Sequence, residues 1–165
     1  MHSIHKVGKS FWYITPVSLT DRPILGMVVG SKKTLMIDAG NSEEHMHYFL
    51  NELQKRGVPN PDLVVLTHWH WDHIFGLSAL PDTVSIASKE TEREMEKLIP
   101  FSWSDEAIDA RVNEGVEIEF CAKAIKEEYT NHRNIKITLP DITIEKRAEI
   151  NLGDIYQFVG IFDDS

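Results

Sequence analysis

Cysteine is nearly absent from this chain, and acidic side chains outnumber basic ones. One cysteine, Cys121, occurs in 165 residues, which excludes an internal disulfide framework. Lys and Arg number 17 against 26 Asp and Glu, so the formal net charge is −9. This charge disfavours binding to nucleic acid, which needs a surplus of basic side chains. We therefore expect a small-molecule substrate and no nucleic-acid partner.

Apolar runs long enough to span a membrane are also missing from the sequence. The N-terminal residues lack the charged and apolar zones of a signal peptide. These two absences predict a cytoplasmic protein with no membrane partner.

What is present is the composition of one folded domain, with 42% apolar and 26% charged residues. Neither a repeat nor a linker interrupts the chain, so we predict a single domain over residues 1–165. Residues 1–40 and 135–161 favour strands. Residues 89–130 favour helices, broken by a proline and a glycine, and we interpret them as a helical insertion.

A helix is predicted between two strands in the first half of the chain, which together form an α/β unit. The first strand covers residues 34–37, and the helix covers 41–56 with Asn41 as its N-cap and Glu44 completing a capping-box pair. The apolar stripe of the helix consists of Met46, Phe49, Leu50 and Leu53. Residues 63–66 are apolar throughout, which suits a strand buried on both faces.

Directly after this strand, the stretch 67–73 reads Thr-His-Trp-His-Trp-Asp-His, and its potential metal ligands are His68, His70, Asp72 and His73. His68 and His70 point to the same side of an extended segment, and a turn after them would bring the other two nearby. Imidazole and carboxylate groups are ligands that zinc, iron and manganese accept. Because binding sites are commonly built at the carboxyl ends of buried strands, we predict a metal-binding cluster rather than surface histidines crowded by chance.

This stretch resembles the His-x-His-x-Asp-His signature of the metallo-β-lactamase fold superfamily. The tripeptide Asp38-Ala39-Gly40 is similar to the Asp-x-Gly motif of that family, and Gly76 also fits the pattern. The resemblance covers residues 24–80, with a looser echo over 139–161.

The resemblance implies an αβ/βα sandwich that is incomplete in its second half. It implies that His68 and His70 bind one metal ion and that Asp72 and His73 bind a second, so one or two zinc ions are expected, with iron or manganese as substitutes. Asp38 would orient these ligands, although without the resemblance it reads as an aspartate in a turn. The implied activity is hydrolysis of an ester, thioester, lactone or similar bond by metal-bound hydroxide, with Asp72 as the catalytic residue that orients water or moves a proton.

The second half of the chain departs from the family pattern. Family members have a third histidine for the first metal, a bridging aspartate and a last histidine, and the sequence stops at Ser165, where the third histidine is expected. His132 lacks the surroundings of a substitute. This departure predicts an alternative, a truncated and catalytically inactive fragment with weak metal binding. Its unfinished sheet would expose an edge that pairs with another copy, giving a homo-oligomer.

Three further questions stay open at this point. Trp69 and Trp71 either pack around the ligands or line the mouth of a substrate site. The insertion 89–130 either covers the site or presents a solvated acidic face. A di-iron redox protein is a lesser alternative to a hydrolase. Family relatives of that kind have a flavin-binding partner domain, and none is recognisable in this sequence.

Overall fold

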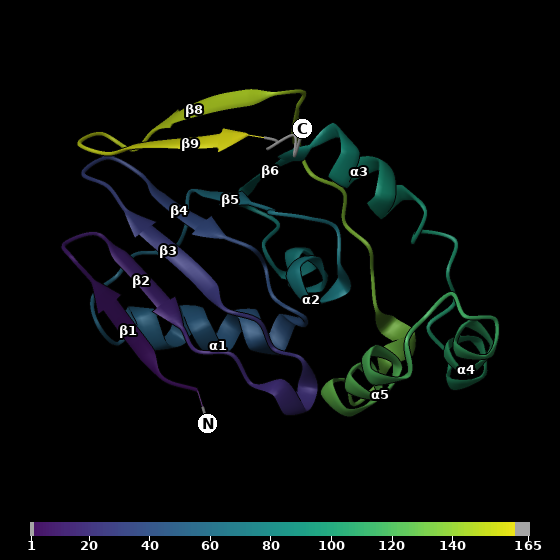
Figure 1. Cartoon of the computed structure of the whole chain (residues 1–165). Coiled ribbons are helices and arrows are strands. Elements are labelled where there is room, and N and C mark those ends of the chain that lie inside the picture. Colours follow the sequence, from purple (N-terminus) through teal and green to yellow (C-terminus); the bar gives the residue numbers. More distant parts are fainter. Residues whose placement is uncertain (1, 161–165) are drawn as a thin grey trace.

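The structure of the chain is a computed structural model that describes residues 2–160, with side chains described for residues 2–156. Within these residues it contains a seven-stranded sheet, a two-stranded sheet and five α-helices. Figure 1 shows the small sheet lying over the large one, with the helices gathered below and beside the strands.

The strands of the large sheet follow one another in chain order from β1 to β7. Neighbouring strands from β1 to β4 are antiparallel, and those from β4 to β7 are parallel. The strand bounds are β1 Ile4–Val7, β2 Phe11–Ile14, β3 Leu25–Val29, β4 Thr34–Ile37, β5 Leu63–Val65, β6 Val84–Ser88 and β7 Ile142–Ile144. The strands predicted at residues 34–37 and 63–66 are therefore confirmed.

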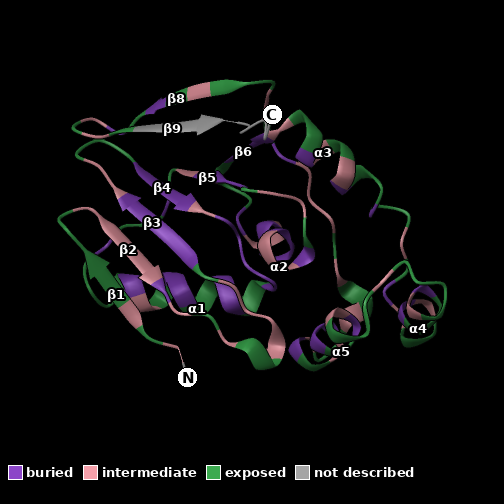
Figure 2. Ribbon diagram, in the orientation of Figure 1, coloured by how far each residue is buried: buried purple, intermediate pink, exposed green. Residues whose placement is uncertain are grey.

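Both faces of the large sheet are buried along its central strands β3, β4 and β5, as expected for the apolar run of β5, because alternate residues point to opposite faces. One face joins the main core with helix α1 (Glu43–Gln54), through Leu25, Met27, Met36, Val64 and Ala87. The other packs against the hairpin of β8 (Arg147–Asn151) and β9 (Tyr156–Gly160), through Val28, Leu35, Val65 and Ile86. Figure 2 shows the buried residues along β3 and β4. Ile161, the last residue of the predicted tail strand, lies outside the described residues.

Helix α1 confirms the predicted helix, but its N-cap differs from the prediction. The cap is Ser42, whose Oγ accepts a hydrogen bond from the backbone N–H of His45 at 3.0 Å. The prediction that Asn41 caps the helix is wrong, because its side chain is buried and donates to the carbonyl of Thr20 at 2.7 Å. The predicted apolar stripe is buried as expected, at Met46, Phe49, Leu50 and Leu53.

Helices connect the parallel strands of the large sheet. Helix α1 links β4 to β5, and α2 (Trp71–Ile74) with the 3-10 helix η2 (Phe75–Ala79) links β5 to β6. The predicted insertion is helical as expected and lies between β6 and β7, as α3 Lys89–Glu96, α4 Asp105–Asn113 and α5 Glu119–Glu128. Figure 1 shows these three helices grouped on the side of α2 away from β1. Among the helices of residues 2–160, none is both long and apolar enough to cross a lipid bilayer.

A buried ion pair fastens the end of α5 to the body of the domain. Nη2 of Arg22 lies 2.8 Å from Oε1 of Glu128, whose side chain is 1% exposed. The hydroxyl of Ser42 donates to the same carboxylate, and the hydroxyl of Tyr129 donates to the carbonyl of Asn41 at 2.9 Å. The insertion is therefore held against the N-terminus of α1.

The turn after β4 packs against the loop after β5 so closely that one position requires glycine. The backbone N–H of Ala39 donates to the carbonyl of His73 at 2.8 Å, and that of Gly76 donates to the carbonyl of Gly40 at 3.0 Å. A Cβ at position 76 would lie 2.1 Å from the carbonyl oxygen of Ala39. A side chain there would force the two segments apart.

We expect Gly76→Ala to lower the free energy of unfolding by about 3 kcal/mol, because the added methyl overlaps a backbone carbonyl. Gly57→Ala is the matched control, because a Cβ there meets no atom within 4 Å and only its φ of 76° opposes the change, which costs about 1 kcal/mol. Urea unfolding followed by circular dichroism measures both losses. Equal losses would contradict the close packing at Gly76.

We expect Glu128→Gln to lower the free energy of unfolding by about 3 kcal/mol, because it removes the buried counter-charge of Arg22 and leaves only Glu44, which lies 3.4 Å away and has a side chain that is 77% exposed. Glu145→Gln is the control, since Glu145 and its partner Lys89 have side chains that are 71% and 52% exposed. Removing that surface pair should cost less than about 1 kcal/mol. If both variants unfold at the same urea concentration as the parent chain, the buried pair does not anchor α5.

Candidate metal centre

The predicted ligands and Asp38, the residue predicted to orient them, lie at the carboxyl ends of two neighbouring strands. Asp38 directly follows β4, and the stretch 67–73 begins shortly after β5. Because β4 and β5 pair in parallel, their carboxyl ends reach the same edge of the sheet. The backbone N–H of Asp38 donates to the carbonyl of Val65 at 2.8 Å, which continues the pairing into the site.

Asp38 is a buried carboxylate that contacts the ligand stretch 67–73 through both of its oxygens. Oδ1 accepts from the backbone N–H of Thr67 at 2.7 Å, and the hydroxyl of Thr67 lies 2.9 and 2.8 Å from Oδ1 and Oδ2. Oδ2 also lies 2.8 Å from Nδ1 of His73. The backbone of Asp38 has a φ of 60°, a left-handed conformation that non-glycine residues rarely adopt. The surrounding contacts hold it there.

His73 lies between two carboxylates. Its Nδ1 contacts Asp38, and its Nε2 lies 3.1 Å from Oδ2 of Asp72. Burial lowers the pKa of His73, but the hydrogen bonds and charges of the two aspartates outweigh it and raise the pKa to about 9. In the metal-free protein, this ring is therefore protonated at neutral pH, and both of its nitrogens donate.

His68 and His70 lie next to this group. The predicted turn after His70 is the start of α2, because His70 is the N-cap of that helix. The ring centroid of His68 lies 4.7 Å from that of His70 and 4.0 Å from that of His73. Burial, followed by the charges of His73 and His70, lowers the pKa of His68, which favours the neutral ring that binds metal. His132 is not part of the cluster, since its Nδ1 contacts the carbonyl of Trp103.

The chemistry of these donors fits a divalent metal ion, and one pair fits it in distance as well. Two donors about 2.1 Å from one tetrahedral zinc ion lie about 3.4 Å apart, close to the 3.1 Å between Nε2 of His73 and Oδ2 of Asp72. The contact of Asp38 with Nδ1 leaves Nε2 to face the metal. Within residues 2–160, no three His, Cys, Asp or Glu side chains are arranged to hold one ion. The described residues therefore supply a donor pair with two imidazoles beside it.

A cavity of about 500 Å³ opens beside His70 and Asp72. Its aromatic walls come from both the ligand stretch and the insertion, and consist of Trp69, Trp71, Phe101 and Trp103. Both tryptophans of the ligand stretch thus line the cavity, and Trp71 also packs against Phe75 with ring centroids 5.7 Å apart. Residues of the insertion form one side of the site. The sequence alone did not distinguish this role from that of a solvated acidic face.

Three carboxylates at this cavity are not among the predicted site residues, namely Asp21, Glu94 and Glu117, and Glu94 is paired with Lys97. Asp21 lies between β2 and β3, and Glu117 lies between α4 and α5. Burial, followed by the charge of Asp72, raises the pKa of Asp21, and burial raises the pKa of Glu117. In the sequence, Asp21 stands in an ordinary turn signal and Glu117 in an acidic stretch, so only the tertiary fold separates them from solvated carboxylates.

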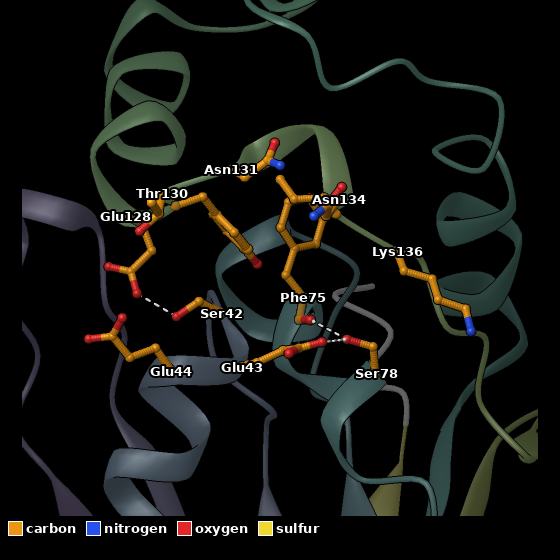
Figure 3. A pocket seen from close by; sticks show the side chains of 12 residues that line it. Ser42, Glu43, Glu44, Phe75, Ser78, Glu128, Thr130, Asn131, Asn134 and Lys136 are labelled. Atoms are coloured by element: carbon orange, nitrogen blue, oxygen red, sulfur yellow. Dashed lines mark hydrogen bonds between the residues drawn. The ribbon is translucent and has the colours of Figure 1, made fainter.

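A second cavity, of about 260 Å³, lies over the N-terminus of α1 (Figure 3). Figure 3 shows partners for two of its acidic side chains: the hydroxyl of Ser78 donates to Glu43 at 2.9 Å, and that of Ser42 donates to Glu128. The third, Glu44, lies 3.4 Å from Nη2 of Arg22. The residues that line this cavity include none of the four predicted ligands. The predicted metal ligands therefore belong to the cavity beside His70 and Asp72.

Comparison with known proteins gives one family match. The sequence profile of the metallo-beta-lactamase superfamily matches residues 20–152. This range contains Asp38, the stretch 67–73 and the whole insertion. No curated protein matches the chain significantly.

Solved structures share the fold at low sequence identity. A metallo-beta-lactamase from Pontibacter korlensis has a TM-score of 0.60 and 15% identity, over 94% of this chain and 58% of its own. A HARLDQ-motif mutant of a metallo-beta-lactamase from Cronobacter sakazakii has a TM-score of 0.60 and 14% identity, over 93% of this chain and 51% of its own. The FIM-1 enzyme from Pseudomonas aeruginosa in its mono-zinc form has a TM-score of 0.50 and 14% identity, over 58% of this chain and 46% of its own. The chain spans about half the length of these structures, and the predicted fold class is confirmed.

We expect a pKa of about 9 for His73 in the metal-free protein, measured by NMR titration of the histidine rings and assigned with His73→Gln. The pKa of His73 in the folded chain exceeds the value of 6.5 for a free ring. The charged ring therefore stabilises the fold fully below pH 6.5, and this stabilisation is lost as pH rises through 9. The loss should be on the order of 2 kcal/mol and absent from His73→Gln. A His73 pKa near that of a free ring would rule out its pairing with both aspartates.

Proposed function

Because the chain belongs to the metallo-beta-lactamase superfamily, we propose that it is a metal-dependent hydrolase with the ligands His68, His70, Asp72 and His73. The observation that carries the proposal is the continuous contact from Asp38 through His73 to Asp72, at 2.8 and 3.1 Å, beside the cavity of about 500 Å³. A hydrolase needs such an ordered donor set next to a space for its substrate.

Zinc is the metal that we assign to this site. Two imidazoles, His68 and His70, would hold one ion, and Asp72 with Nε2 of His73 would hold a second. A solved structure that shares the fold, FIM-1, is a mono-zinc form, and zinc prefers the nitrogen and oxygen ligands found here. Iron and manganese accept the same ligands.

Asp38 prepares the site by fixing the orientation of the His73 ring. Its Oδ2 accepts the Nδ1 proton, so Nε2 faces Asp72 and the ligand stretch. A carboxylate that accepts a hydrogen bond from the other ring nitrogen of a ligating histidine, as Asp38 does here, also raises the basicity of the ring. A divalent ion at this position would supply Lewis acidity, which favours the ionisation of water at neutral pH and polarises a carbonyl group.

Asp72 is the residue that we assign to proton transfer. It is partly exposed, it borders the cavity, and only one of its oxygens has a short contact with His73. The other oxygen is positioned to accept a proton from the attacking water and return it to the leaving group. Aromatic side chains on the cavity walls displace bulk water from the reacting groups, which strengthens the electrostatic interactions there. The reaction is the hydrolysis of an ester, thioester, lactone or similar bond.

We expect one or two zinc ions per chain after purification without chelator, measured by elemental mass spectrometry. His73→Ala should lower the zinc content and the affinity for zinc by about tenfold or more, because it removes one ligand and the partner of Asp38. His47→Ala is the matched control, since His47 is an exposed histidine of α1. The zinc-loaded chain should hydrolyse 4-nitrophenyl acetate, S-phenyl thioacetate or dihydrocoumarin, and Asp72→Asn should lose that turnover while retaining some zinc.

The alternative of an inactive fragment makes the opposite prediction for the same measurements. It is supported by the missing third donor within residues 2–160 and by the partial coverage of the solved structures. A chain that binds less than about a tenth of an equivalent of zinc, iron or manganese and hydrolyses none of the three substrates would overturn the hydrolase proposal. Iron in place of zinc, without hydrolysis, would favour the redox alternative.

A further inference from the structure

Most of the wall area of the cavity beside the ligand stretch is apolar. Four aromatic side chains line it, Trp69, Trp71, Phe101 and Trp103, and aliphatic side chains complete the lining at Leu98, Val116 and Ile118. Trp71 and Trp103 are buried, so these rings are held in place rather than free to turn into solvent. A volume of about 500 Å³ falls within the range of small-molecule sites. Such walls favour an apolar group of aryl or acyl size.

The charged groups at this cavity are mostly acidic. Lys97 is the only Lys or Arg among the residues that line it, and its Nζ is paired with Glu94 at 2.5 Å. Asp72 is assigned to the metal, so its charge is offset when an ion is bound. Asp21 and Glu117 remain, from two different sides of the cavity. The charges of Arg111 and His70 act on Glu117 and that of His73 on Asp21, but burial outweighs them and raises the pKa of both carboxyl groups. A negatively charged substrate would be repelled by both.

We propose that the substrate is an uncharged ester or lactone whose apolar acyl or aryl group enters this cavity, and that Asp21 and Glu117 exclude anionic analogues. This inference rests on the proposed hydrolase function. Among the substrates named above, it favours molecules without a negative charge. It also gives Asp21 and Glu117 a role in substrate specificity. Phosphodiesters, thioesters with phosphate-bearing carriers and substrates with a free carboxylate are then poor substrates.

The segment between α4 and α5 supplies matched pairs of residues for a test. Glu117 and Ile118 line the cavity, whereas their neighbours Glu119 and Phe120 do not. Ile118 and Phe120 are similarly exposed, at 64% and 51%. A substitution at Glu117 or Ile118 therefore probes the cavity, and the same substitution at Glu119 or Phe120 controls for a general change in charge or surface.

Binding to the metal-free protein tests the inference without any need for turnover. The probes are 4-phenylbutyramide and 4-phenylbutyrate, which have the same shape and differ in charge. Tryptophan fluorescence reports binding, because Trp69, Trp71 and Trp103 line the cavity. We expect the amide to bind about tenfold more tightly than the carboxylate at low salt. The ratio of the two dissociation constants should fall toward one as salt is added, because salt screens the repulsion.

The variants should change this preference in defined ways. Glu117→Gln and Asp21→Asn should each strengthen binding of the carboxylate about threefold and leave the amide unchanged, and Glu119→Gln should change neither. Ile118→Ser should weaken both probes, whereas Phe120→Ser should weaken neither. Asp21→Asn tests the charge independently of Glu117 and keeps a residue that tolerates the left-handed backbone at position 21, where φ is 52°.

Hydrolysis by the zinc-loaded chain separates this inference from the function on which it rests. We expect kcat/KM for 4-nitrophenyl butyrate to exceed that for mono-4-nitrophenyl succinate by about tenfold, and the gap to narrow in Glu117→Gln. Equal or faster hydrolysis of the anionic ester, unchanged in the variant, overturns the assigned specificity while the hydrolase stands. A clear preference for the amide in binding, with no turnover of either ester, supports the selectivity of the cavity and overturns the hydrolase. Equal binding of both probes, or none, overturns the inference.

Discussion

The candidate site depends on one buried carboxylate that bridges the ends of two parallel strands. Asp38 accepts hydrogen bonds from the backbone and hydroxyl of Thr67 and contacts Nδ1 of His73. A buried charge is tolerated only where partners of this kind surround it. The pairing of β4 with β5 brings these partners together, and the absence of a side chain at Gly76 allows the backbones to close over them. Asp38 thereby fixes Thr67 and His73, the two ends of the stretch that carries the ligands.

The insertion contributes the other half of the site, and it is held by contacts that are independent of the ligands. Arg22, Glu128 and Ser42 join α5 to the body of the domain, while Phe101 and Trp103 face the ligand stretch across the cavity. Arg111 stacks on both rings, with its guanidinium carbon 4.7 and 4.8 Å from their centroids. The cavity wall is therefore a rigid aromatic surface rather than a loose flap.

Local patterns in the sequence predicted the elements whose stability is local. The apolar stripe of α1, the doubly buried strand β5 and the ligand stretch could all be read from spacing alone. The cap of α1 could not, because Asn41 and Ser42 both suit a cap and Asn41 is drawn away by the carbonyl of Thr20. Asp21 and Glu117 were missed for a similar reason. Their role comes from distant segments that meet only in the folded chain, and a carboxylate in a turn or on a helical surface looks the same in either case.

The insertion leaves the sheet at β6 and returns at β7, and these two strands are direct neighbours in the sheet. Because the two strands are parallel, any connection between them must cross from one edge of the sheet to the other, and a segment of different length or composition could do so with little further loss of chain entropy. Asp38 and the ligand stretch are attached to β4 and β5 and would keep their geometry through such an exchange. The ligands are therefore fixed by the sheet, while part of the substrate cavity is supplied by a separable segment, so substrate preference can change by replacement of that segment while the reaction stays the same.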